Sequence, residues 1–173
     1  MSKAEVISTA AETATAFEKA HHGCAQCVLA GIMKAFDIEA PEVFKASTGF
    51  SGGMGCTGRT CGALTGGILS IGLFIGRDLS DLEDAPRRRW QNFALVKDLI
   101  ERYEATFGSL DCRDVQQKVV GLSIDLWNRE EAKRFGTEYD GHNKCAEGVV
   151  GVVAGWTAQI LLDYLDGVSE VAL

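Results

Sequence analysis

Apolar residues recur every three or four positions along almost the whole chain, and this spacing limits the folds that the sequence can adopt. It predicts helices, and no stretch has the apolar–polar alternation with a period of two that a half-buried strand requires. The chain has 173 residues and only two prolines, which is near the length of one ordinary domain. The sequence therefore predicts a single all-α domain over residues 1–173, a compact bundle of six or seven helices with a glycine-rich loop.

Capping residues and glycines mark the ends of the predicted helices. Asp84 is expected to cap a helix that has Pro86 just inside it and Gly108 at its end. A short helix is expected to open at Pro41 and to close at Gly49. The remaining helices, the first of them capped by Ser2, are expected at about residues 3–20, 24–36, 60–76, 114–135 and 142–165.

The same periodicity assigns buried faces to two of these helices. Trp90 and Phe93 are expected on the buried side of their helix, because large aromatic side chains bury much apolar area. That assignment leaves the basic residues 87–89 in solvent. In the first helix the predicted buried stripe consists of Val6, Ala10, Thr13 and Phe17.

Glycine is abundant, and some of it falls inside predicted helices. The chain has 20 glycines, where average usage would give roughly 12. A glycine inside a helix costs up to about 1 kcal/mol relative to alanine, so its presence needs a reason. Gly72 and Gly76 are four residues apart, as are Gly151 and Gly155. We expect these pairs to allow close packing of helix backbones, or alternatively to form the seam of a homodimer.

Charge and hydropathy exclude two classes of partner. The formal net charge is -7, and an acidic surface does not attract phosphate backbones, so no nucleic-acid binding is expected. The longest apolar run, residues 149–162, is shorter than the about 20 residues of a membrane span, which predicts a buried helix and no membrane insertion. The first 20 residues lack the apolar segment of a signal peptide, so we expect a cytoplasmic protein with reduced cysteines.

A glycine-rich loop over residues 49–58 contains two patterns known from nucleotide-binding proteins. Residues 53–58 fit G-x-G-x-x-G, and residues 53–60 fit a phosphate-binding loop except that Arg59 replaces the required lysine. Both patterns bind phosphate only where a strand feeds the loop and a helix follows it. No strand is predicted before this loop, so nucleotide binding is not expected.

Six cysteines are the main candidates for chemistry. Cys24 and Cys27 form a C-x2-C pair, and Cys56 and Cys61 form a C-x4-C pair. Thiolates at short spacing bind zinc or iron–sulfur clusters, so spacing alone selects these four residues as ligands. Residues three apart also share one face of a helix, which leaves core packing open as an alternative for the first pair.

The position of the cysteines relative to the predicted helices suggests a different set. Cys24, Cys61, Cys112 and Cys145 each fall close to the first turn of a predicted helix, where the helix dipole favours a thiolate. Four converging helix ends would form an electropositive pocket for an anionic thiolate cluster. Four other residues flank these cysteines: Arg113, for which a thiolate pair and a surface salt bridge are both open, and His21, His22 and His142, which are expected to be solvated or capping.

Several segments of the chain resemble a known family of proteins. They cover about residues 15–165 and contain cysteines in the order C…CGAxxG…C…C. The sequence resembles the bacterial and archaeal family of redox-active proteins named for this order, and is similar to the cysteine-bearing part of split-Soret cytochrome c. The matching segments are Cys24-Ala25-Gln26, Val28-Leu29, residues 49–55, residues 61–66, Cys112-Arg113 and Lys144-Cys145.

The resemblance implies a ligand set and a function. Its four cysteines correspond to Cys24, Cys61, Cys112 and Cys145, which in the cytochrome are associated with an iron–sulfur cluster, [2Fe–2S]; no haem is implied. The other two cysteines depart from the family pattern and are possible extra thiols. We therefore expect a redox protein, without classical catalytic residues, that exchanges electrons with a partner protein or senses redox state. A metal-free thiol–disulfide oxidoreductase that uses Cys61 as nucleophile, and a structural zinc site, are the alternatives.

Overall fold

The computed structural model describes residues 1–171, with side chains as far as residue 168. Within that range the protein is all-α, as predicted, and its only β-type pairing is one bridge between Thr60 and Asp111. A 3-10 turn (Ser47–Phe50) follows α3, and a π-helical turn (Ala146–Val150) joins α8 to α9. The helices are α1 (Lys3–His21), α2 (Cys24–Phe36), α3 (Pro41–Ala46), α4 (Gly62–Ile75), α5 (Arg88–Phe107), α6 (Cys112–Val120), α7 (Arg129–Thr137), α8 (Gly141–Cys145) and α9 (Gly151–Val171).

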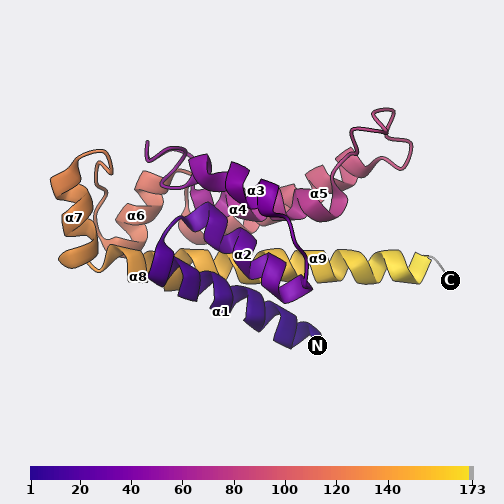
Figure 1. Cartoon of the computed structure of the whole chain (residues 1–173), viewed down its shortest axis with the longest axis horizontal. Helices are drawn as coiled ribbons and strands as arrows, with labels where there is room; N and C mark the ends of the chain where they lie inside the picture. Colours follow the sequence, from indigo (N-terminus) through magenta and orange to yellow (C-terminus); the bar gives the residue numbers. More distant parts are fainter. Residues whose placement is uncertain (172–173) are drawn as a thin grey trace.

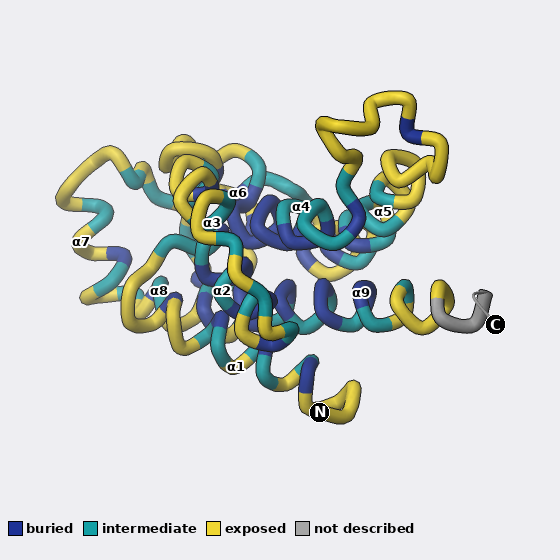
Figure 2. Tube along the Cα trace, turned by 45° about the vertical axis from the view of Figure 1, so that its right-hand side comes forward, coloured by how far each residue is buried: buried dark blue, intermediate teal, exposed yellow. Residues whose placement is uncertain are grey.

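Helix α9 runs along the length of the bundle, and the other long helices pack around it (Figure 1). Helix α1 packs on α2 and α9, α2 packs on α4, and α4 packs on α5. The short helices α6, α7 and α8 gather at one end, and the loop between α4 and α5 projects at the other (Figure 1). Buried residues concentrate in α2, α4 and the middle of α9 (Figure 2).

The buried stripe of α1 is shifted from the predicted one. Ser2 caps α1 as predicted, through a capping box with Glu5. The buried side chains then follow at intervals of four, whereas Phe17 is 40% exposed. The prediction for Thr13 and Phe17 was wrong because small residues, not large ones, face α2. The stripe consists of Val6, Ala10, Ala14 and Glu18.

Close packing of helix backbones is confirmed for one predicted glycine and not for another. A Cβ atom on Gly151 would lie 2.2 Å from Oγ1 of Thr15, so α9 and α1 need glycine there. Gly72 has no atom within 4 Å of such a position, and the prediction of close packing was wrong for it. The close approach of α4 to α2 is made instead by Gly66, whose added Cβ would lie 2.5 Å from the carbonyl oxygen of Ala25.

Helix α5 begins two residues after Pro86 and has Arg87 at its N-cap position, so the predicted cap position was wrong, although Asp84 still binds the first N–H groups of the helix. The Asp84 carboxylate accepts hydrogen bonds from the backbone N–H of Arg88 (2.8 Å) and of Arg89 (3.1 Å). Gly108 ends the helix in the left-handed conformation, as predicted.

The buried side of α5 was assigned wrongly at its beginning. Trp90 is 61% exposed and Phe93 is 51% exposed. The first turns of α5 lie at the end of the molecule that carries the projecting loop (Figure 1), so they have little to pack against. The buried residues of this helix follow later, at intervals of four, and are Leu99, Tyr103 and Phe107.

The helix predicted over residues 114–135 is two helices. Gly121 ends α6 with a φ angle of 94°, which glycine adopts readily and other residues rarely do. Residues 122–128 then form a loop, and the side chain of Asn128 caps α7 by accepting from the N–H groups of Glu130 and Glu131. The break raises the helix number by one and places a loop beside the glycine-rich segment.

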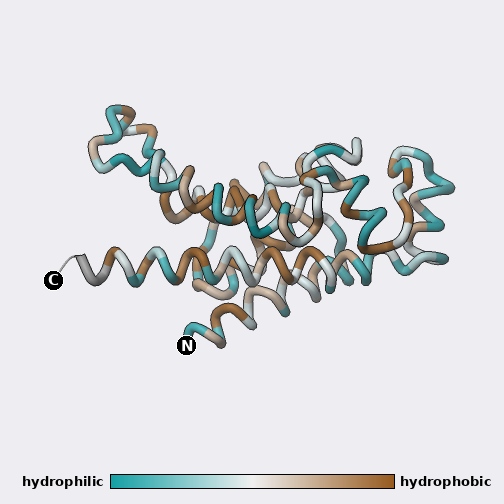
Figure 3. Tube along the Cα trace, turned by 180° about the vertical axis from the view of Figure 1, so that it is seen from behind, coloured by the Kyte–Doolittle hydropathy of each residue, from teal (hydrophilic) through white to brown (hydrophobic). Residues whose placement is uncertain are grey.

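The continuous helix of α8, the π-helical turn and α9 is long and apolar enough to cross a membrane by length and composition. Its most apolar window is 56% buried inside the bundle, as in the core helix of a soluble protein. Apolar turns likewise concentrate in the middle of the molecule (Figure 3). This burial agrees with the predicted core helix.

Candidate metal centre

Five of the six cysteines line one cavity of about 180 Å³, and four of these five are buried or half-buried, whereas Cys56 is exposed. Cys24 is the first residue of α2, Cys61 immediately precedes α4, Cys112 is the first residue of α6 and Cys145 is the last residue of α8. The structure therefore brings together the set indicated by helix ends and by the resemblance. Of the set selected by short spacing, Cys24, Cys56 and Cys61 also line the cavity, and only Cys27 lies outside it.

A short antiparallel pairing places two of these cysteines side by side. The N–H of Cys61 donates to the carbonyl of Leu110 at 2.8 Å, and the N–H of Cys112 donates to the carbonyl of Arg59 at 2.7 Å. These bonds flank the bridge between Thr60 and Asp111. Two segments about 50 residues apart in the chain are thus fixed in register, with a sulfur at the end of each.

Cys61 is the most acidic thiol of the cavity. A hydrogen bond from the Cys112 thiol lowers its pKa to about 7, against the opposing effect of burial. The N–H groups of Ala63 and Leu64, at the start of α4, also stabilise the thiolate. The buried hydroxyl of Tyr103 lies close enough to lower the pKa further, although it makes no hydrogen bond of ordinary geometry.

The other three buried or half-buried thiols of the cavity are held in the protonated form. Burial raises the pKa of Cys24, and the negative charge on Cys61 raises it further. The pKa of Cys112 is raised by the hydrogen bond that its thiol donates to Cys61 and by burial. Burial raises the pKa of Cys145 to about 12. Without a cation the cavity therefore supports one thiolate, and four thiolates require a positively charged group among them.

Glycines of the loop bring backbone close to the sulfur atoms. A Cβ on Gly62 would lie 2.4 Å from Sγ of Cys24, and one on Gly53 would lie 2.7 Å from Cβ of Cys112. The N–H of Gly52 hydrogen-bonds to Cys24 and lowers its pKa, although burial outweighs this effect. The loop thus supplies an amide group at the sulfur of Cys24.

The expectation that all four cysteines lie in first helical turns was wrong for Cys145. It is the fifth residue of the helical stretch that begins at Gly141, and the π-helical turn follows it directly. Turns of this kind are rare and frequently occur at functional sites, because they change the register of the residues around them.

The two remaining cysteines and Arg113 have different surroundings. Cys27 is buried outside the cavity, and its thiol donates to the carbonyl of His22 at 3.3 Å. Cys56 is exposed and lies on the cavity wall. The guanidinium of Arg113 donates to the carbonyl of Thr57 at 3.2 Å, so it holds the glycine-rich loop instead of pairing with a thiolate or with a surface carboxylate.

Histidines lie nearer to the cavity than predicted. His22 and His142 both line it, with their rings stacked at 3.7 Å, whereas His21 packs on Phe17. Glu18 lies beside both rings, is 5% exposed and was not predicted from the sequence. The signal was present, because residue 18 continues the four-residue interval of the buried stripe of α1.

The distances between the cysteine sulfurs limit which metal ion or cluster the cavity can bind. Within the described part of the chain, no three cysteine sulfurs lie within 4.8 Å of one another. One zinc ion, with Zn–S bonds of about 2.3 Å, needs its four sulfurs roughly 3.8 Å apart. A single zinc ion would therefore require the thiols to move closer together, and all-cysteine donor sets bind both zinc and iron–sulfur clusters.

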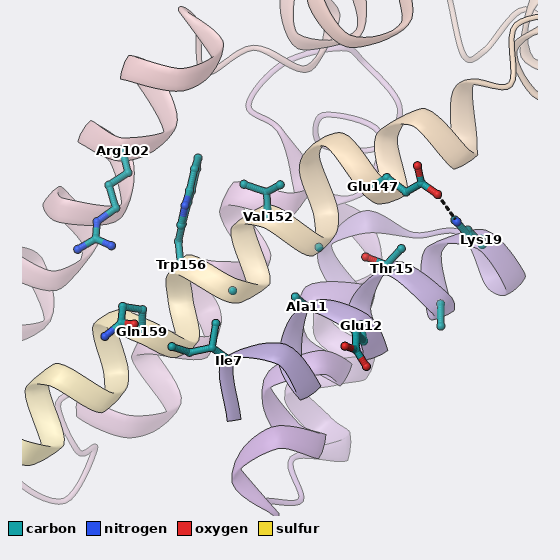
Figure 4. Close-up of a pocket in the computed structure, with 13 residues that line it drawn as sticks. Ile7, Ala11, Glu12, Thr15, Lys19, Arg102, Glu147, Val152, Trp156 and Gln159 are labelled. Carbon is teal, nitrogen blue, oxygen red and sulfur yellow. Dashed lines mark hydrogen bonds and ion pairs between the residues drawn. The ribbon is translucent and has the colours of Figure 1, made fainter. Parts of the chain in front are cut away.

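A second cavity, of about 680 Å³, opens between α1 and α9 (Figure 4). Trp156 and Ile7 form part of its apolar wall, and an ion pair between Lys19 and Glu147 lies at its edge. No cysteine or histidine lines it. We assign no chemistry to this cavity.

Comparison with known proteins gives one match. A family model described as “Putative redox-active protein (C_GCAxxG_C_C)” matches residues 22–160, a range that contains all the cysteines. The corresponding central segment of this chain reads Cys61-Gly62-Ala63-Leu64-Thr65-Gly66, with cysteine before glycine. No curated protein and no solved structure matches, so the similarity to split-Soret cytochrome c stays a prediction.

Proposed function

Because the chain belongs to the C_GCAxxG_C_C family of redox-active proteins, we propose that it binds an iron–sulfur cluster and serves in electron transfer or redox sensing. The proposed ligands are Cys24, Cys61, Cys112 and Cys145. The observation that carries the proposal is the cavity itself, in which four thiols from four helices meet and only one is a thiolate without a cation. We further propose a cytoplasmic protein that exchanges electrons with a partner protein.

The protein's part in this chemistry is to hold the thiolates and to set the potential. A bound [2Fe–2S] cluster would supply one-electron oxidation and reduction. The N–H groups of Ala63 and Leu64 at Cys61, and of Gly52 at Cys24, stabilise negative charge on sulfur. Such donors raise a cluster's reduction potential, because the reduced form carries more negative charge. Burial of the cavity acts in the opposite direction.

Among the described residues no three cysteine sulfurs lie within 4.8 Å of one another, which favours a cluster over a single zinc ion. In [2Fe–2S] sites two thiolates bind each iron, so the two pairs lie on opposite sides of the cluster. A single tetrahedral ion would require all four sulfurs to move together. We therefore favour an iron–sulfur cluster over zinc as the group that this cavity binds.

A second candidate function rests on the pair formed by Cys61 and Cys112. The Cys61 thiolate has a pKa of about 7 and a thiol partner beside it, as in dithiol oxidoreductases. In that reaction Cys61 attacks a substrate disulfide, one substrate sulfur leaves as a thiolate, and Cys112 then resolves the mixed disulfide. The pair ends as a disulfide and the substrate as two thiols. Cys24 and Cys145 have no part in this chemistry.

Anaerobic metal and sulfide analysis tests the proposal. We expect about two irons and two sulfides per chain, with visible absorption from sulfur-to-iron charge transfer. Serine at any of the four proposed ligand positions should reduce the iron content severely, and Cys27→Ser, which changes a buried cysteine outside the cavity, should not. Protein that stays colourless and iron-free after anaerobic reconstitution would refute the proposal. If that protein shows a disulfide exchange activity, and if the single substitution Cys61→Ser abolishes it, the second candidate would be favoured.

A further inference from the structure

Three side chains with metal-binding atoms meet at the edge of the cysteine cavity, between the end of α1 and α8. They are Glu18, His22 and His142, and one ligand atom of each lies within 4.8 Å of the other two. We propose that these three residues form a second metal site, without sulfur ligands, for a divalent transition-metal ion of the zinc type. All three residues also line the cysteine cavity, so the second site would lie directly beside the proposed cluster.

Glu18 provides an unsatisfied carboxylate. It is 5% exposed, and its Oε2 atom has no hydrogen-bond partner of ordinary geometry, although its carboxylate lies close enough to the Cys27 thiol to raise the pKa of that thiol. The other oxygen, Oε1, lies 3.9 Å from Nδ1 of His142, which is too long for a hydrogen bond. A buried carboxylate oxygen without a partner is costly, and a bound cation would satisfy it.

His22 is held so that one nitrogen is free to bind a metal. Its Nδ1 lies 2.9 Å from the backbone carbonyl of Glu18, which assigns the proton to Nδ1 and leaves the lone pair on Nε2. Histidines that bind metals ordinarily donate their other N–H in this way. His22 also has a φ angle of 60°, which is unusual for a residue other than glycine. The Cys27 thiol donates to the carbonyl of His22 and so fixes this turn.

His142 is positioned by ring contacts on both sides. Its ring stacks on that of His22, at 3.7 Å between centroids and an interplanar angle of 25°. The buried ring of Phe135 meets it edge-on at 5.2 Å. Phe135 therefore limits the movement of His142, whereas the two stacked rings must separate before each can direct a nitrogen at the same ion.

The donor set indicates the class of ion. Two imidazoles and one carboxylate suit zinc and ferrous iron, whereas calcium and magnesium prefer oxygen ligands alone. Three protein ligands leave coordination positions open, as in zinc sites that bind water or substrate. With bonds of about 2.0–2.1 Å, the ligand atoms need to lie roughly 3.3 Å apart, so the side chains must close slightly on the ion.

Cobalt(II) distinguishes this site from the cysteine cavity by its spectrum. We would titrate cobalt into the full chain after its cysteine cavity has been reconstituted anaerobically, and count bound cobalt. We expect one additional ion per chain with weak visible bands and without a thiolate-to-cobalt charge-transfer band. Glu18→Gln and His142→Ala should each weaken this binding at least tenfold. His21→Ala, which changes the neighbouring histidine outside the group, should leave it unchanged.

Three results would overturn the proposal: no additional cobalt, wild-type cobalt affinity in both Glu18→Gln and His142→Ala, or an added ion whose spectrum shows sulfur ligands. The half-buried His142 gives a second variant if Glu18→Gln does not fold. Repeating the titration on Cys61→Ser separates the two proposals, because the weak bands should persist there even if no cluster forms. Iron and sulfide contents measured on the same variants report on the cluster alone.

Discussion

The Cα atom of Gly62 lies so close to the sulfur of Cys24 that a Cβ atom at this position would be 2.4 Å from Sγ. The same Cβ would lie 2.9 Å from the carbonyl oxygen of Phe50. The first turn of α4, the start of α2 and the glycine-rich loop therefore share a contact that only glycine permits. The position of one proposed ligand depends on the absence of a side chain from the helix of another.

Gly62→Ala should therefore displace Cys24 and lower cluster occupancy severely, by a factor of several in iron and sulfide per chain. Gly72→Ala, in the same helix, is the matched control because no atom lies within 4 Å of the added Cβ. It should keep full occupancy and should stabilise the fold by up to about 1 kcal/mol. Equal iron contents in the two variants would contradict the packing argument.

Thiolate titration of the reduced, metal-free protein should reveal Cys61 first. Its pKa is lowered to about 7, mainly by the Cys112 thiol, whereas those of Cys24 and Cys112 are raised. Ultraviolet absorbance should therefore rise by one thiolate per chain with a midpoint near pH 7. The step should vanish in Cys61→Ser and move to higher pH in Cys112→Ala. A first step near the ordinary thiol value of 9 would refute the assignment.

The shifted pKa values of these thiols predict that the stability of the metal-free protein passes through a maximum as the pH is raised. The lowered pKa of Cys61 contributes stability that is complete above pH 9 and is lost as the pH falls through 7. The raised pKa of Cys145 contributes stability below pH 9 that is lost as the pH rises towards 12. Denaturant unfolding should therefore show the contribution of Cys61 increasing between pH 7 and 9. Cys61→Ser should remove this increase, and an unchanged profile would contradict it.

The sequence predicted the helical class and several helix ends because these depend on local chemistry. Asp84 accepts from two backbone N–H groups at the start of α5, and Gly108 ends that helix, as their residue types indicate. Gly121 was missed because a single glycine within a helical pattern does not by itself mark a break. Its φ angle of 94° is a property of the folded chain.

The candidate site was predictable only in part, for a related reason. Short spacing favoured the pairs that contain Cys27 and Cys56, since neighbours in sequence are the easiest contacts to foresee. The pairing that brings Cys112 to Cys61 is a long-range backbone contact, which no local pattern encodes. Glu18 was not singled out from the sequence, because carboxylates are rarely buried. Its burial depends on the packing of α1 against the cavity wall.

Tyr103→Phe tests whether a hydroxyl next to the cluster tunes its potential. The Tyr103 side chain is fully buried, and its hydroxyl lowers the pKa of Cys61 without an ordinary hydrogen bond. Its removal should raise the Cys61 pKa and make the potential of the bound cluster more negative, because a donor near sulfur is lost. The unfolding free energy should change by less than about 1 kcal/mol, since no well-formed bond is broken. Tyr164→Phe, whose exposed hydroxyl bonds to Gln91, should leave the potential unchanged.

Trp127 joins the loop after α6 to the glycine-rich loop, and its loss should shorten the lifetime of a bound cluster. The indole Nε1 donates to the carbonyl of Gly55 at 2.9 Å, and the neighbouring Leu126 lines the cysteine cavity. The side chain is 73% exposed, so Trp127→Ala should cost little stability. Bleaching by air or a chelator should nevertheless become several times faster, because the two loops are no longer held together. Trp90→Ala, an exposed tryptophan at the opposite end, should bleach at the wild-type rate, and equal rates for the two variants would show that this contact does not protect the site.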